Sequence, residues 1–215
     1  MSRIYDISQT LATDTPVWPG DTPFQIAPNW KMEGGCPVLV SRLTLSTHSG
    51  SHADAPSHYV PDGSHMAEAA LHPYLGPCHV VRAQAGDGPV TLADIETDLE
   101  ALEEVPERLL VRTFDHFPHE RWPTGFRAID ADLIRYLGQN GCVLIGTDTP
   151  SLDPETAKIL KAHAAIADMK MAILEGLVLD DVPVGLYELV ALPLKIQHAD
   201  ASPVRAILRT YPDDS

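Results

Sequence analysis

Proline is the residue that most restricts the fold of this chain, because it ends or kinks helices and cannot donate a hydrogen bond inside a sheet. The 215 residues include 19 prolines, more than the average of about 5% in proteins. They cluster near the N-terminus, at residues 56–61 and at residues 118–123. We therefore expect short elements joined by many structured loops. No repeat, low-complexity tract or Gly/Ser-rich linker divides the sequence, which predicts a single domain over residues 1–215.

The apolar pattern predicts more strands than helices. Strands are predicted at short apolar or alternating runs, namely residues 4–7, 38–46, 79–83, 109–112, 142–146, 189–196 and 204–209. Helices are predicted behind capping residues, namely over residues 91–102, 130–139 and 153–163. In the last of these, Pro154 occupies the favoured first position. The sequence therefore predicts an α/β fold with a largely β core, in which helices flank a mixed sheet.

Charge and composition limit the partners that this chain can have. Apolar residues make up 44% and charged residues 21%, as in a soluble domain with a hydrophobic core. Because 15 Lys and Arg face 30 Asp and Glu, the net charge is −15. Such a chain repels nucleic-acid phosphates and anionic lipids, so neither nucleic acid nor a membrane is an expected partner. Three widely spaced cysteines, no long apolar run and no apolar N-terminal stretch predict a cytoplasmic protein.

The segment His48–His58, with the sequence HSGSHADAPSH, is the densest chemical feature of the chain. It holds three of the ten histidines, where the composition would place about half of one. Its apolar residues are alanine and proline alone, which do not fill a core. Gly50 and Pro56 argue against a regular helix or an interior strand. The segment is therefore either a polar, solvated turn or a metal site.

Imidazoles and a carboxylate are the usual nitrogen and oxygen donors of zinc. His48, His52 and Asp54 are candidate ligands that leave coordination positions open for a reaction. The two oxygens of Asp54 can bridge two metal ions about 4 Å apart. His58, beyond Pro56, is a candidate proton shuttle near the metal rather than a ligand.

Further ligands have to come from elsewhere in the chain. The remaining histidines are candidates, namely His65, His72, His79, His116, His119, His163 and His198. His79 lies in an apolar run and is expected in the core, whereas His116 and His119 are candidates to line a pocket. Glu175 stands in an apolar stretch, where a glutamate is rarely buried unless it is paired. A metal ligand and a salt-bridged glutamate at a strand end are both open interpretations of Glu175.

The spacing H-x-G-x-H-x-D-x-P-x-H over residues 48–58 resembles the motif of the metal-dependent cyclase-like hydrolases. Further blocks support the resemblance in the expected order, namely residues 5–8, 17–21, 146–151, 162–163 and 173–177. The block around Trp18 points to the bacterial kynurenine formamidases, also called arylformamidases. Ser51 stands where many relatives have threonine, and this change leaves every proposed ligand in place.

The resemblance implies two zinc ions per chain. By position, His48, His52 and Asp54 would bind the first ion. Asp54, His163 and Glu175 would bind the second ion, with Glu175 also reaching the first. The same nitrogen and oxygen donors would also accept Mn²⁺ or Co²⁺.

The resemblance also implies a fold and a reaction. The fold is a β-rich single domain of the swivelling β/β/α type, assembled as a homodimer. The reaction is the zinc-dependent hydrolysis of N-formyl-L-kynurenine, a small aromatic formamide, to L-kynurenine and formate in tryptophan breakdown. His58 would be the general acid/base, and Trp18 would contact the substrate.

Three alternatives belong to other functional classes or substrates. A sister hydrolase of the same family would act on another amide or on a cyclic amide such as isatin. A non-haem iron oxygenase would use two histidines and one carboxylate, but it leaves His48 and His58 unexplained and fits a double-sheet jelly roll poorly. A metal-storing or metal-sensing protein would have a closed, cysteine-rich site, and no cysteine lies near the cluster.

Overall fold

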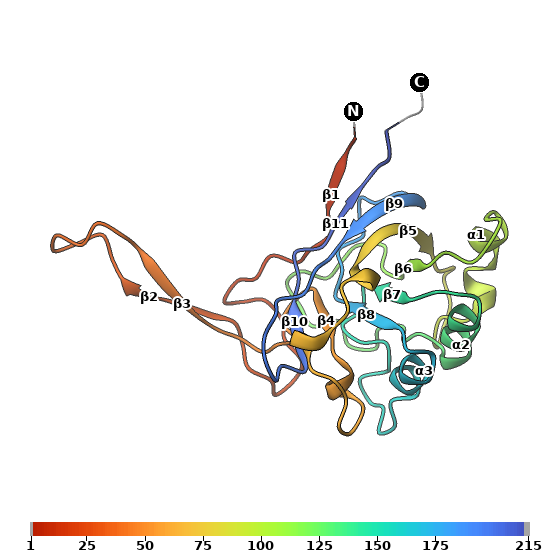
Figure 1. The fold of residues 1–215 in the computed structure, drawn as a ribbon, viewed down its shortest axis with the longest axis horizontal. Coiled ribbons are helices and arrows are strands. Elements are labelled where there is room, and N and C mark those ends of the chain that lie inside the picture. The colour runs from red at the N-terminus through yellow and green to blue at the C-terminus, as the bar shows by residue number, and fades with distance from the viewer. Residues whose placement is uncertain (1, 213–215) are drawn as a thin grey trace.

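The computed structural model describes residues 2–212. Its body is a nine-stranded mixed sheet in the order β1-β11-β9-β5-β6-β7-β8-β4-β10, which Figure 1 shows curling across the molecule. These strands are β1 (Ile4–Asp6), β4 (His52–Asp54), β5 (Leu75–Arg82), β6 (Arg108–Arg112), β7 (Leu144–Thr147), β8 (Ala172–Glu175), β9 (Gly185–Val190), β10 (Ala201–Pro203) and β11 (Ile207–Arg209). The four central strands β5 to β8 run parallel, and the outer pairs are antiparallel. This confirms the α/β fold and excludes a jelly roll.

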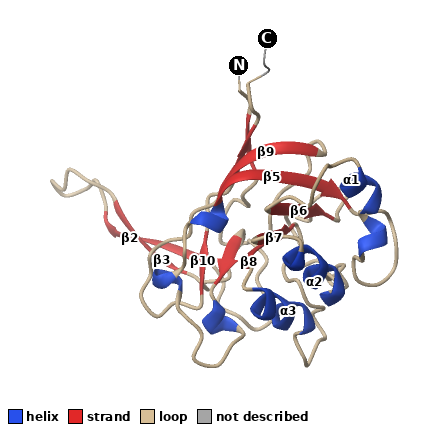
Figure 2. Cartoon of the chain, turned by 45° about the vertical axis from the view of Figure 1, so that its right-hand side comes forward, coloured by secondary structure: helices blue, strands red, loops and turns tan. Residues whose placement is uncertain are grey.

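Three α-helices gather on one side of the sheet, as Figure 2 shows. They are α1 (Glu96–Glu100), α2 (Ala131–Gln139) and α3 (Lys161–Met169). Asp130 caps α2 by accepting the N–H of Asp132, and the apolar stripe of α2 packs with α3 against the sheet. Alternate residues of β6 point to opposite faces, so Leu109 lies in the core under these helices and Leu110 in the core of the other face. No helix within residues 2–212 is long and apolar enough to cross a membrane.

Two expectations about the functional region are wrong. The third helix does not span residues 153–163, because α3 begins only at Lys161. The Asp153 carboxylate instead accepts the N–H groups of Ala162 and His163 at the start of α3.

Residues 52–54, which were not expected in an interior strand, form β4 and pair on both sides, with β8 and with β10. The expected helix over residues 91–102 is shorter, with α1 following a 3₁₀ turn that the Thr91–Asp94 capping box opens.

A two-stranded hairpin projects away from the body as an arm, as Figure 1 shows. It is formed by β2 (Gln25–Trp30) and β3 (Val40–Thr44), and neither strand joins the main sheet. The expected strand over residues 38–46 is thus present, but its residues in β3 are exposed on both faces. Pro28 interrupts the pattern of β2, which explains why the sequence did not reveal that strand.

Candidate metal centre and substrate cleft

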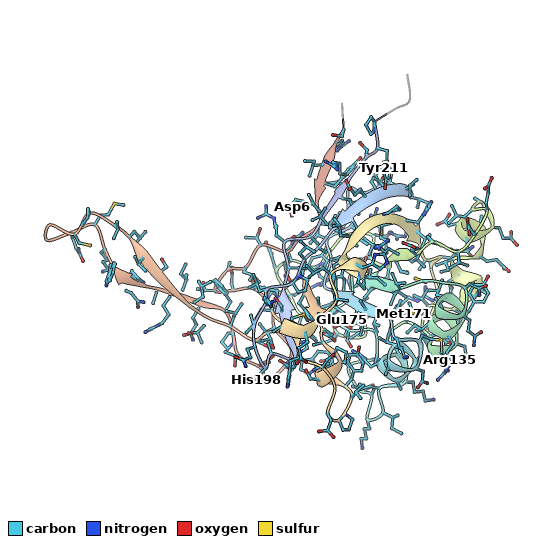
Figure 3. The ribbon with its side chains drawn as sticks, in the orientation of Figure 1. Asp6, Arg135, Met171, Glu175, His198 and Tyr211 are labelled. Atoms are coloured by element: carbon cyan, nitrogen blue, oxygen red, sulfur yellow. The ribbon has the colours of Figure 1, made fainter. Side chains whose placement is uncertain are left out.

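Strand β4 carries two of the expected ligands. His52 and Asp54 are two residues apart, so their side chains leave the same face of the strand, whereas Ala53 belongs to the hydrophobic core. On the adjacent strand β8, Glu175 lies directly opposite His52 in the antiparallel register. Figure 3 shows Glu175 inside the body of the molecule. Sheet pairing therefore brings together three residues that lie up to 123 positions apart in the sequence.

His48 reaches this cluster from the turn before β4, where its Nδ1 lies 3.1 Å from Asp54 Oδ1. Glycines make the approach sterically feasible. Gly50 has a φ of 63°, and a Cβ at this position would lie 2.7 Å from the side chain of Leu11. A Cβ on Gly176, just after β8, would lie 2.6 Å from the carbonyl oxygen of Gly50. The two glycines let the turn and the end of β8 pack closely beside the ligands.

His163 enters the cluster from the first turn of α3. Its Nδ1 lies 2.7 Å from Asp153 Oδ2, and the ionised carboxylate can only accept a hydrogen bond. We therefore assign the proton of the neutral imidazole to Nδ1, which leaves the lone pair of Nε2 free. A carboxylate behind a histidine in this way is the usual support of a metal ligand.

Besides the contact of Asp54 with His48, the carboxylates of Asp54 and Glu175 both face His52 and His163. Asp54 Oδ1 lies 3.5 Å from His52 Nε2, and Asp54 Oδ2 lies 3.4 Å from His163 Nε2. Glu175 Oε2 lies 3.3 Å from His52 Nε2, and Glu175 Oε1 lies 3.7 Å from His163 Nε2. Because each Asp54 oxygen faces a different histidine, the carboxylate has the orientation of a bridge between two cations.

The chemistry of these donors fits a metal. Four of their buried atoms have no hydrogen-bond partner within residues 2–212, namely His52 Nε2, both carboxylate oxygens of Asp54 and His163 Nε2. A buried polar group left unpaired costs about 1–3 kcal/mol, so a fold that gathers four of them needs a compensating ligand. His52 Nδ1 lies 2.9 Å from the carbonyl oxygen of Gly50, which places its proton there and frees Nε2. Ligation by these atoms would satisfy all four.

The electrostatics of the cluster also favour a cation at its centre. Burial opposes the charge of Asp54, but the adjacent imidazoles of His163 and His48 prevail and hold the pKa of Asp54 well below its usual range. Burial likewise opposes the charge of His48, yet Asp54 and Asp200 raise the pKa of that imidazole to about 9. Asp153 and Asp54 raise the pKa of His163 to about 10 against the same opposition. Protons or metal ions can supply the positive charge that these carboxylates attract.

His58 lies beside the ligands and is more accessible than they are. Its side chain is 33% exposed, against 3% for His52. Burial is the main reason that its pKa is lowered. Its Nδ1 lies 3.6 Å from Asp200 Oδ2, an oxygen that is also 3.2 Å from His48 Nε2. Sequence reasoning missed Asp200, because no motif surrounds it and it arrives through the loop before β10.

The cluster lies at the floor of a cleft of about 510 Å³, whose walls include residues 16–21, 117–118 and 121–123. Trp18 lines the cleft, as expected for a substrate contact, and packs edge-to-face on Trp122 with ring centroids 5.4 Å apart. Trp122 Nε1 donates a hydrogen bond to Glu155 at 3.0 Å. Sequence reasoning missed Trp122 as well. The two indole rings form an apolar wall suited to an aromatic ring.

The other histidine candidates do not join the cluster. Within the described part of the chain, Phe117 and Pro118 line the cleft, but the flanking His116 and His119 do not, so that expectation is wrong. His79 lies on β5, as expected, but it is only partly buried and does not belong to the core. The remaining three lie elsewhere, His72 against Arg108 and His65 against His198.

Comparisons with known proteins identify similar sequences over the whole chain. The family model called Cyclase matches residues 5–154. A protein of Maricaulis maris (strain MCS10) named kynurenine formamidase is 54% identical over 213 residues, which cover 99% of this chain and 100% of the relative. A protein of Sphingopyxis alaskensis with the same name is 50% identical over 97% of this chain and 99% of its own length.

Solved structures share the fold. A structure described as a potential metal-dependent hydrolase with cyclase activity is 26% identical, has a TM-score of 0.82, and matches over 99% of this chain and 100% of its own. Isatin hydrolase A from Labrenzia aggregata, bound to benzyl benzoate, has a TM-score of 0.83 at 24% identity over 98% of this chain and 94% of its own. At that identity the second likeness concerns the fold alone.

Proposed function

Because the chain belongs to the cyclase family, we propose that it is a kynurenine formamidase, an amide hydrolase that converts N-formyl-L-kynurenine to L-kynurenine and formate in tryptophan degradation. The observation that carries this proposal is the convergence of unpartnered His and Asp donors at the floor of a cleft with a tryptophan wall. The relatives named kynurenine formamidase support the same substrate.

We propose zinc as the metal, with two ions per chain. His48, His52 and Asp54 would hold one ion, and Asp54, His163 and Glu175 the other. The two orientations of the Asp54 oxygens and the unpartnered Nε2 atoms of His52 and His163 support this arrangement. When bound, such ions supply Lewis-acid activation of water and of the formyl group.

The chain's own residues position the substrate and manage a proton. Trp18 and Trp122 offer their apolar faces to the aryl ring. His58 Nδ1 is directed towards Asp200, which leaves Nε2 to serve the reaction. During hydrolysis the C–N bond of the formamide breaks, and the departing aryl nitrogen needs a proton. His58 Nε2 donates this proton and regains one from the attacking water over the cycle.

We also propose a homodimer, with the arm of β2 and β3 packed on a second copy. A lone two-stranded hairpin is marginally stable in water, yet this arm exposes large apolar side chains, namely Ile26, Trp30, Met32, Leu39 and Leu43. Exposed apolar surface of this kind marks an interaction site. The free thiols Cys36, Cys78 and Cys142 support a cytoplasmic location.

Assays of purified protein test the proposed function. We expect release of L-kynurenine and formate from N-formyl-L-kynurenine, loss of this activity after dialysis against a strong chelator, and its return on addition of zinc. Isatin in parallel assays tests the sister-hydrolase alternative, and oxygen uptake tests the oxygenase alternative. Full activity in metal-free protein, or turnover of isatin with none of the formamide, would contradict the proposal.

A further inference from the structure

Arg121, in the wall of the cleft, has no role in the hydrolysis proposed above. Arg121 lines the cleft and is the only Lys or Arg among its lining residues in the described chain. Its guanidinium makes no ion pair or hydrogen bond within residues 2–212. By contrast, six arginines elsewhere pair with carboxylates, namely Arg82, Arg108, Arg127, Arg135, Arg205 and Arg209. In a chain with a net charge of −15, an unpaired guanidinium at a cleft is available to an external anion.

The loop that presents Arg121 is held at several points. Next to it, Trp122 packs on Trp18 and donates to Glu155. Before it, the N–H of Phe117 donates to Asp180 at 2.8 Å. At the start of the loop, the buried Asp148 carboxylate accepts the N–H groups of residues 113 and 114. Because the backbone is fixed in this way, little ordering of the loop is needed when a ligand binds.

One exposed carboxylate lines the same cleft. Asp21 follows Trp18 in the loop of residues 16–21, and Glu175, the only other acidic lining residue of the described chain, is buried among the candidate ligands. Asp21 Oδ1 accepts the N–H of Thr22 at 2.6 Å, and its second oxygen has no such bond. The cleft lining therefore presents one exposed cation and one exposed anion, on two different loops.

We propose that Arg121 binds the α-carboxylate of the substrate and that Asp21 binds its α-ammonium group. This inference rests on the proposed function. In N-formyl-L-kynurenine the formamide and the amino-acid chain occupy adjacent ring positions. With the ring on Trp18 and Trp122 and the formyl group at the floor, the zwitterionic end extends towards the outer part of the cleft, where the two charged side chains lie. Arg121 offers parallel N–H donors that match a carboxylate.

This assignment makes the two residues determinants of specificity rather than of chemistry. Aryl formamides that lack the amino-acid end should react less efficiently in the wild type, because they forgo a charge-assisted hydrogen bond at Arg121. The difference is expected in KM more than in kcat, since the contact is equally strong before and during the reaction.

The test compares three substrates. The first is N-formyl-L-kynurenine, the second 2-formamidoacetophenone, which lacks the amino-acid end, and the third 4-(2-formamidophenyl)-4-oxobutanoate, which keeps the carboxylate but lacks the ammonium group. We expect Arg121→Gln to lower the ratio of kcat/KM for the first substrate over the second by about tenfold. Asp21→Asn should lower the ratio of kcat/KM for N-formyl-L-kynurenine over that for 4-(2-formamidophenyl)-4-oxobutanoate. Arg121→Gln should leave this second ratio unchanged, because both substrates carry the carboxylate.

Arg135→Gln is the matched control, because Arg135 lies on the outer side of α2 (Figure 3) and pairs with Asp132 there. Its substrate ratios should equal those of the wild type. Weaker binding of L-kynurenine to Arg121→Gln, measured by calorimetry, should accompany the kinetic change. If Arg121→Gln lost the same factor in kcat/KM on N-formyl-L-kynurenine and on 2-formamidoacetophenone, or lost nothing on either, the assignment would be overturned. The formamidase activity itself would remain in place. A wild type inactive on every formamide would instead overturn the proposed function, and this inference with it.

Discussion

His58 and the candidate ligands have different environments, and this difference predicts different consequences of substitution. The His58 ring lies 4.2 Å from the His48 ring and 5.9 Å from the His163 ring, but it is far more exposed than His52 or His163. His58→Ala should lower kcat by about 10²–10⁴-fold, the usual contribution of a general acid or base, with wild-type metal content. Steady-state kinetics and elemental analysis measure the two effects. A variant that purifies with less metal would make His58 a ligand.

The proposed pair of ions predicts two different metal counts. His163→Ala removes one side of the second site only, so this variant should keep one ion where the wild type keeps two. Glu175→Gln preserves shape but removes a charge that faces both His52 and His163, so it should weaken retention of both ions and cut activity severely. Titration with zinc, followed by elemental analysis, gives the counts. If the wild type and both variants saturated at one ion, His163 and Glu175 would not be metal ligands and would have structural roles only.

The site residues that could be predicted from the sequence lie close together in the chain, whereas those that could not are brought to the site by long-range contacts. His48, His52 and Asp54 sit in one short segment, where histidine density alone draws attention. Asp200 and Trp122 carry no local signal, because the contacts that place them at the site are with His48 and Trp18, more than 100 positions away. Side chains that depend on long-range contacts cannot be recognised from local pattern.

At the scale of elements, apolar patterns and capping residues predicted a helix or strand correctly where the tertiary contacts favour the same element. The buried run of β6 and the capped, amphipathic α2 were evident from the sequence. The helix expected from Asp153-Pro154 was wrong because the carboxylate of Asp153 holds the start of a later helix instead. The three-residue β4 is too short to show alternation, and its pairing with β8 and β10 overrides Gly50 and Pro56 on either side.

A buried arginine ties β6 to the turn and strand before it. Arg108 is 1% exposed, and its guanidinium donates to the carbonyl oxygens of His72, Pro73 and Pro77. Arg108→Met keeps most of the volume but leaves these acceptors unpaired, so the free energy of unfolding should fall by about 2–3 kcal/mol. Urea denaturation measures this loss.

The exposed Arg135→Met is the control for that experiment, and it should change the free energy of unfolding by no more than about 0.5 kcal/mol. Equal effects of the two substitutions would show that the buried hydrogen bonds contribute no more than a surface ion pair.

At the scale of the whole molecule, the proposed homodimer predicts an effect of substitutions in the arm. Ile26 and Leu43 lie directly opposite each other on one face of the hairpin, and Ala27 and Arg42 are the next pair, on the other face. The double variant Ile26→Thr/Leu43→Thr keeps strand propensity but removes apolar contact, so it should shift the protein from dimer to monomer in analytical ultracentrifugation. Arg42→Thr should leave the dimer intact. A double variant as dimeric as the wild type would place the interface elsewhere.

The order of strands in the sheet also governs when the protein can assemble during synthesis. β1 has one neighbour, β11, and Figure 1 shows these two strands side by side. β4 pairs only with β8 and β10, both made more than 100 residues later. Strand β4 therefore stays unpaired until residues 172–175 have left the ribosome, and β1 until residues 207–209 have. Non-local pairing of this kind slows folding and exposes unpaired edges meanwhile, so a nascent chain truncated before residue 201 can neither complete the sheet nor enclose the His and Asp donors.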